Sequence, residues 1–126
     1  MVRKIVFRLP ALLIFGGIWW LSSQTILPQP KGVLGFDKVQ HLIAYAALSM
    51  SLGLWFSGKQ WKNNARGTML LLFSIASIYG IIDEVHQYFV PGRDCNVWDW
   101  AADVLGAILG ALGAVCIAGK ICQHDD

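Results

Sequence analysis

Four long apolar stretches alternate with short polar connectors along the chain. They cover residues 9–26, 39–56, 68–90 and 97–118. A membrane-spanning helix needs roughly 17–25 residues, so each stretch is long enough to cross a bilayer with modest tilt. Pro28, Pro30 and Pro91-Gly92 mark turns between the stretches, and residues 57–67 predict a short basic turn. The pattern therefore predicts an all-α integral membrane bundle of four transmembrane helices, with a single domain over residues 1–126.

The composition favours the same class of protein. Of the 126 residues, 56% are hydrophobic and 14% are charged, whereas a soluble domain usually carries about 25% charged residues. The net charge is only +2 and the basic residues are scattered, so we expect no nucleic-acid partner. The first stretch has some features of a signal peptide. It lacks a clean small-x-small site before Gln24 and carries Trp19-Trp20 as an interface anchor, so we expect an uncleaved helix.

The distribution of Lys and Arg predicts the orientation in the membrane. Seven of these residues lie in the N-terminal flank, in the 57–67 connector and in the C-terminal flank, against three on the other side, Lys31, Lys38 and Arg93. Because cytoplasmic loops carry an excess of Lys and Arg, we expect a multi-pass protein with both termini in the cytoplasm.

Ionisable residues gather at the predicted extracytoplasmic ends of the last three stretches. An ionisable group inside a span costs about 2.5–3.5 kcal/mol on insertion scales and normally faces a bundle interior or a water-filled cavity. The presence of so many ionisable residues in a short chain therefore predicts one shared polar pocket. The carboxylates of this set are Asp37, Asp83, Glu84, Asp94, Asp99 and Asp103, and its other ionisable members are Lys38, His41, His86 and Arg93. The neutral amide of Gln87 lies among them.

Helical spacing places these residues on a few inward-facing stripes. The stripes are Asp37, His41 and Tyr45; Asp83 and Gln87; and Asp99, Asp103, Gly106, Gly110 and Gly113. Residues four apart share one helix face, and the last set falls within an arc of about 80°. Gly106 and Gly110 form a GxxxG pair, which lets a neighbouring helix approach closely. We therefore expect the acids on this stripe to point into the bundle.

Several kinds of chemistry fit such a pocket. A carboxylate beside a histidine can act as general acid and base, which makes Asp83, Glu84 and His41 the candidate catalytic residues. Carboxylate and imidazole are also ordinary metal ligands, but no HExxH or comparable spacing is present, so no metal site is predicted. A plainer alternative is that Lys38 and Arg93 neutralise nearby acids and lock the helices together. Two cations cannot neutralise six carboxylates, which favours a functional pocket.

These polar residues also carry a family resemblance. The pattern Asp37-Lys38-x-x-His41-x-x-x-Tyr45, then Asp83-Glu84-x-His86-Gln87-x-Phe89-x-Pro91-x-Arg93, then Asp99-x-x-x-Asp103-x-x-Gly106, resembles the VanZ-like family. Asp103 departs from the Asn that many members have there. The resemblance implies a multi-pass membrane protein of the bacterial envelope, in the cytoplasmic membrane. It also implies a link to glycopeptide resistance, because the founding member is associated with resistance to teicoplanin.

We therefore expect an extracytoplasmic pocket that binds or modifies a lipid-linked or cell-wall precursor group. Lys38 and Arg93 would hold its anionic part, and the other expected ligand-binding residues are Asp37, Tyr45, His86, Gln87, Asp99 and Asp103. Two alternatives are a proton- or cation-coupled transport component and an accessory protein that docks to another membrane enzyme. The expected partners are membrane lipid and either a second copy or another membrane protein. The sequence indicates no particular cofactor and leaves open whether a reaction occurs.

Overall fold

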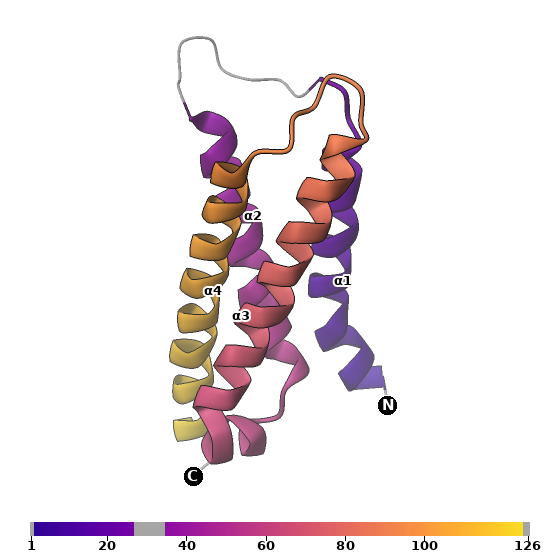
Figure 1. The fold of residues 1–126 in the computed structure, drawn as a ribbon. Coiled ribbons are helices and arrows are strands. Elements are labelled where there is room, and N and C mark those ends of the chain that lie inside the picture. Colours follow the sequence, from indigo (N-terminus) through magenta and orange to yellow (C-terminus); the bar gives the residue numbers. More distant parts are fainter. Residues whose placement is uncertain (1, 27–34, 125–126) are drawn as a thin grey trace.

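The protein is an all-α bundle of four helices, seen in a computed structural model that describes residues 2–26 and 35–124. The helices are α1 (Val2–Ser22), α2 (Phe36–Leu52), α3 (Gly58–Tyr88) and α4 (Val97–His124), and a 3-10 helix η1 (Gly53–Trp55) follows α2. They run alternately up and down, so that α1 and α3 point one way while α2 and α4 point the other (Figure 1). The ends marked N and C lie together at one end of the bundle.

Three of the helices are long and apolar enough to cross a membrane. The candidate spans are Ile5–Ser22 in α1, the whole of α3, and Val97–Ala118 in α4. Large apolar side chains such as Leu13 and Leu70 are exposed on the outside of the bundle, as expected for helices that face lipid. The protein is therefore a multi-pass membrane protein. The 17 residues of α2 lie at the lower limit of a spanning helix.

The prediction of a turn over residues 57–67 is wrong, because α3 begins at Gly58 and includes this segment. A capping box starts the helix: the Gln60 backbone N–H donates to Ser57 Oγ at 3.3 Å, and the Ser57 N–H donates to Gln60 Oε1 at 3.1 Å. Trp61 is buried and its Nε1–H donates to the Gly53 carbonyl at 3.2 Å. A local break at Asn64 separates this first segment from the rest of the helix.

The other predicted elements are found with shifted ends. The first helix ends at Ser22 rather than at residue 26, and the last continues to His124. The predicted loop with Pro28 and Pro30 lies largely in residues 27–34, outside the described residues.

The closest helix packing joins α2 to α4, which run parallel to each other. A Cβ on Gly106 would collide with the carbonyl oxygen of Leu42, and one on Gly110 would collide with that of Ala46. The two backbones touch only because both positions lack a side chain. The predicted role of this glycine pair is confirmed. This contact fixes the start of α2 beside the start of α4, which is where the polar residues lie.

Candidate functional site

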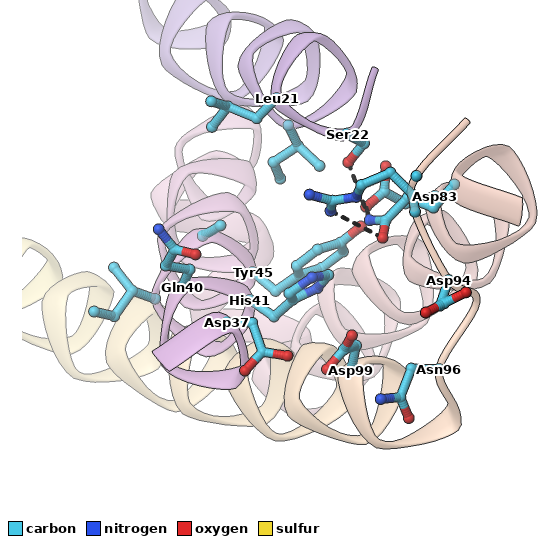
Figure 2. Close-up of a pocket in the computed structure, with 16 residues that line it drawn as sticks. Leu21, Ser22, Asp37, Gln40, His41, Tyr45, Asp83, Asp94, Asn96 and Asp99 are labelled. Carbon is cyan, nitrogen blue, oxygen red and sulfur yellow. Dashed lines mark hydrogen bonds between the residues drawn. The ribbon is translucent and has the colours of Figure 1, made fainter. Parts of the chain in front are cut away.

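A cavity of about 520 Å³ opens at the end of the bundle that is opposite the chain termini. All four helices and the α3–α4 connector contribute to it, and its residues converge as drawn in Figure 2. Ile18, Leu21, Ile43 and Ala44 form an apolar part of the wall, from α1 and α2. The rest of the wall is polar and is made by Ser22, Asp37, Gln40, His41, Tyr45, Asp83, Gln87, Gly92, Arg93, Asp94, Asn96 and Asp99.

One polar chain crosses the cavity from the α3–α4 connector to α1. Arg93 donates to the side-chain oxygen of Gln87 at 3.0 Å, and the Gln87 amide donates to Asp83 Oδ2 at 3.1 Å and to Ser22 Oγ at 3.3 Å. Gln87 and Asp83 are each only 1% exposed. The second oxygen of Asp83 is buried and has no hydrogen-bond partner within the described part of the chain. Gln87 therefore links the guanidinium to a buried carboxylate.

A second set of contacts joins α2 to α4. Lys38 Nζ lies 2.9 Å from Asp37 Oδ2 and 2.9 Å from Asp99 Oδ1. One turn further in, the His41 Nδ1–H donates to Asp103 Oδ1 at 2.8 Å. Asp103 is fully buried, and a carboxylate only accepts, so this contact fixes the orientation of the imidazole.

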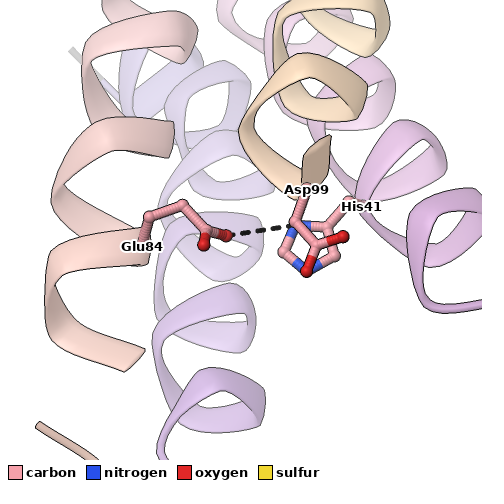
Figure 3. Close-up of side chains that lie close together, drawn as sticks. All are labelled: His41, Glu84 and Asp99. Atoms are coloured by element: carbon pink, nitrogen blue, oxygen red, sulfur yellow. Dashed lines mark ion pairs between the residues drawn. The ribbon is translucent and has the colours of Figure 1, made fainter. Parts of the chain in front are cut away.

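Glu84 lies between these two sets of contacts. One of its oxygens, Oε2, accepts the backbone N–H of Asn96 at 2.9 Å, which ties the end of α3 to the start of α4. The other, Oε1, lies 3.9 Å from His41 Nδ1. His41, Glu84 and Asp99 each offer one possible metal-ligand atom, and these three atoms lie within 4.8 Å of one another (Figure 3).

Most residues singled out from the sequence lie together here. The cavity wall includes Asp37, His41, Tyr45, Asp83, Gln87, Arg93 and Asp99. Lys38, Glu84 and Asp103 are in direct contact with wall residues. The exception is His86, which the structure places outside the cavity wall. Its ring stacks on Trp19 with centroids 3.8 Å apart, and its Nε2 lies 3.4 Å from Ser23 Oγ.

Sequence reasoning missed the apolar part of the wall and three of its polar residues, Ser22, Gln40 and Asn96. Ser22 is the last residue of α1 and carries no motif of its own. Asn96 does leave a recognisable signal, because it precedes α4 and its Oδ1 accepts the Trp98 N–H at 3.0 Å. Asn is a preferred residue at a helix N-terminus, so its position could have been anticipated, although its backbone contact with Glu84 could not.

The fold and the site define a class: a small multi-pass membrane protein with a charged cavity at one end of its helix bundle. The sequence model of the VanZ/LLP1 family matches residues 2–118. The chain therefore belongs to the VanZ/LLP1 family, as the polar motifs predicted. No curated protein and no solved structure gives a significant match.

Proposed function

We propose that this protein crosses the membrane with all four helices and binds the polar end of a membrane amphiphile in its end cavity. The amphiphile would be a lipid-linked or cell-wall precursor that carries an anionic group. The single observation that carries this proposal is the two-sided cavity wall. One part is apolar and is made by side chains of α1 and α2, and the other is charged and is made by the start of α2, the end of α3, the α3–α4 connector and the start of α4. A volume of about 520 Å³ is within the range of small-molecule sites.

Arg93 is the best-placed group for the anionic part of the ligand. It is half-buried at the cavity wall, and one of its nitrogens donates to Gln87. A guanidinium has five N–H donors in a planar fork, so the others suit bidentate contact with a phosphate. Lys38 is less suited to bind the anionic group, because it already forms ion pairs with two carboxylates.

The acids and His41 would act on the rest of the polar group. Asp83 and Glu84 can accept hydrogen bonds from sugar hydroxyls or amines. His41, held by Asp103 at 2.8 Å, can exchange a proton with a group that enters the cavity. The arrangement suits positioning of a ligand and also acid–base chemistry on it.

The proposal requires the cavity to face outward and both termini to face the cytoplasm. Cys95 lies exposed in the α3–α4 connector beside the cavity. A membrane-impermeant thiol reagent applied to intact cells or spheroplasts is therefore expected to label Cys95. A matched Cys95→Ser/Lys59→Cys protein, with its thiol at the other end of the bundle, should remain unlabelled until the membrane is permeabilised. Labelling in the reverse order would place the cavity in the cytoplasm.

Ligand binding is tested with purified protein in detergent. Tryptophan fluorescence or native mass spectrometry should detect binding of a polyprenyl phosphate and much weaker binding of the matching polyprenol. Arg93→Gln should weaken phosphate binding about tenfold, because a charge-assisted pair contributes about 1.5–3 kcal/mol. Arg66→Gln is the matched control, since Arg66 is exposed in the first half of α3. Equal binding of both lipids, or equal effects of both substitutions, would refute the proposal.

In cells, Arg93→Gln or Asp83→Ala should change glycopeptide susceptibility when the variant and the wild-type protein are present at equal levels. Arg66→Gln should leave it unchanged. Unchanged susceptibility for all three variants would remove the link to glycopeptides, while the lipid-binding test would still stand by itself.

A further inference from the structure

His41, Glu84 and Asp99 come from three different helices, α2, α3 and α4. Each offers one ligand atom, and the three atoms lie within 4.8 Å of one another. Ligand atoms around a tetrahedral ion at about 2.0–2.2 Å lie roughly 3.3–3.6 Å apart, so small side-chain rotations would bring these three onto one ion. Figure 3 shows the Glu84 carboxylate pointing across the bundle at the His41 ring, with Asp99 beside that ring.

A second observation points to a cation at this place. Glu84 is only 4% exposed, and its Oε1 has no hydrogen-bond partner among the residues described. The nearest basic atom, His41 Nδ1, is 3.9 Å away, which is too far for a hydrogen bond, and it already donates to Asp103. A buried carboxylate oxygen without a partner is costly. A metal ion among these three side chains would satisfy it.

The surrounding charges favour the same occupant. Asp37, Asp83 and Asp103 add negative charge near the three side chains, and Lys38 is the cation nearest to Asp99, at 2.9 Å. Asp103 accepts the His41 Nδ1–H at 2.8 Å, which leaves Nε2 as the ring nitrogen that can bind an ion. Carboxylates commonly orient metal-binding histidines in this way. One imidazole and two carboxylates suit Zn²⁺ or a similar divalent transition ion.

We propose that His41, Glu84 and Asp99 bind a divalent transition-metal ion, Zn²⁺ or one of similar chemistry, at the inner edge of the cavity. Three protein ligands leave at least one coordination position open, and since His41 and Asp99 line the cavity, this position would face it. The ion would then give an anionic headgroup a second positive contact besides Arg93. That consequence rests on the proposed function, whereas metal binding itself does not.

The test is a calorimetric titration of ZnCl₂ into chelator-treated protein in detergent, without lipid and without a polyhistidine tag. The wild-type chain should bind one Zn²⁺ saturably. Glu84→Gln should weaken binding by about tenfold or more, since even residues that only support a ligand change metal affinity about 10–100-fold. Asp94→Asn removes the same charge from the exposed rim and is the matched control. His86→Ala is the matched control for His41→Ala, because His86 lies outside the cavity wall.

Three further variants keep the test informative if a ligand variant fails to fold. Lys38→Met removes the cation that competes for Asp99 and should tighten Zn²⁺ binding. Asp103→Asn keeps an acceptor for His41 and should bind Zn²⁺ nearly as the wild type does, whereas Asp103→Ala should weaken it about 10–100-fold.

Three results would overturn the metal site: no saturable Zn²⁺ binding to the wild-type chain, equal weakening by Asp94→Asn and Glu84→Gln, or binding that Lys38→Met does not tighten. The headgroup proposal fails separately. A chain that binds Zn²⁺ but does not distinguish polyprenyl phosphate from polyprenol would keep the metal site and lose the proposed function. A chain that distinguishes polyprenyl phosphate from polyprenol but does not bind Zn²⁺ would keep the proposed function and lose the metal site.

Discussion

The two ends of this bundle differ in how their buried polar groups are hydrogen-bonded. At the end near the chain termini, Trp61 is buried against Gly53, its indole N–H is hydrogen-bonded, and a capping box starts α3. The uncharged indole N–H of Trp55 is buried there without a hydrogen-bond partner among the residues described. At the cavity end, Asp83, Glu84 and Asp103 are buried, and each retains an oxygen without a hydrogen-bond partner in the described segments. Burial of unpaired polar groups destabilises a fold. The comparison indicates that one end holds the bundle together, while the other keeps buried carboxylate oxygens unpaired, as the proposed ligand site would require.

The α2–α4 contact connects the two ends, so breaking it should have the largest effect. Gly106→Leu would drive a side chain into the Leu42 carbonyl, and we expect a loss of about 3 kcal/mol or more, or failure to fold. Gly16→Leu is the matched control, because nothing lies within 4 Å of a Cβ at Gly16. The stability of both variants is measured by thermal unfolding in detergent, monitored by near-ultraviolet circular dichroism. Similar losses in the two variants would contradict the close packing of α2 on α4.

At the terminal end, Trp61→Ala should be the next most damaging change. It removes a buried indole and its hydrogen bond to Gly53, and truncation of a buried Trp typically costs about 3–5 kcal/mol. The exposed Trp98→Ala at the cavity end serves as the comparison and should change the unfolding midpoint little. Comparable midpoints for the two variants would mean that the terminal end does not stabilise the bundle.

At the cavity end, a substitution should raise the stability of the fold instead of lowering it. Asp83→Asn removes a buried charge with an unpartnered oxygen and keeps an acceptor for Gln87, so we expect a gain in stability of about 1 kcal/mol. A rise in the unfolding midpoint, accompanied by loss of polyprenyl phosphate binding, is the expected result. A clear drop in the midpoint would show that Asp83 stabilises the fold, and the contrast between the two ends would then fail.

The smallest expected effect concerns the capping box at the start of α3. Ser57→Ala removes the acceptor for the Gln60 N–H, and loss of such a cap typically costs about 1 kcal/mol. Hydrogen exchange should speed up in the segment between Ser57 and the break at Asn64. Exchange in the rest of α3 should not change. A uniform increase along α3 would show that the break does not divide the helix.

The sequence by itself determined the class of protein and most members of the polar cluster. Apolar stretches of spanning length leave the backbone few alternatives to helices in lipid. Spacings of four and three residues assigned Asp99, Asp103 and Gly106 to one helix face. Two predictions failed, and both failures were local: His86 lies outside the cavity wall, and residues 57–67 form part of a helix. Residues 57–67 were predicted to be a turn because they are basic and not apolar. The Ser57–Gln60 capping box, which starts α3, was overlooked.

Only the tertiary structure decided which charged groups meet. Lys38 pairs with Asp99, His41 with Asp103, and Glu84 with the Asn96 backbone, and most of these contacts join residues about 60 positions apart. Such pairings depend on how far each helix slides and rotates against its neighbours. For α2 and α4, the glycine contact sets this position. Helical spacing gives the face of each residue, whereas only packing brings three faces together around one cavity.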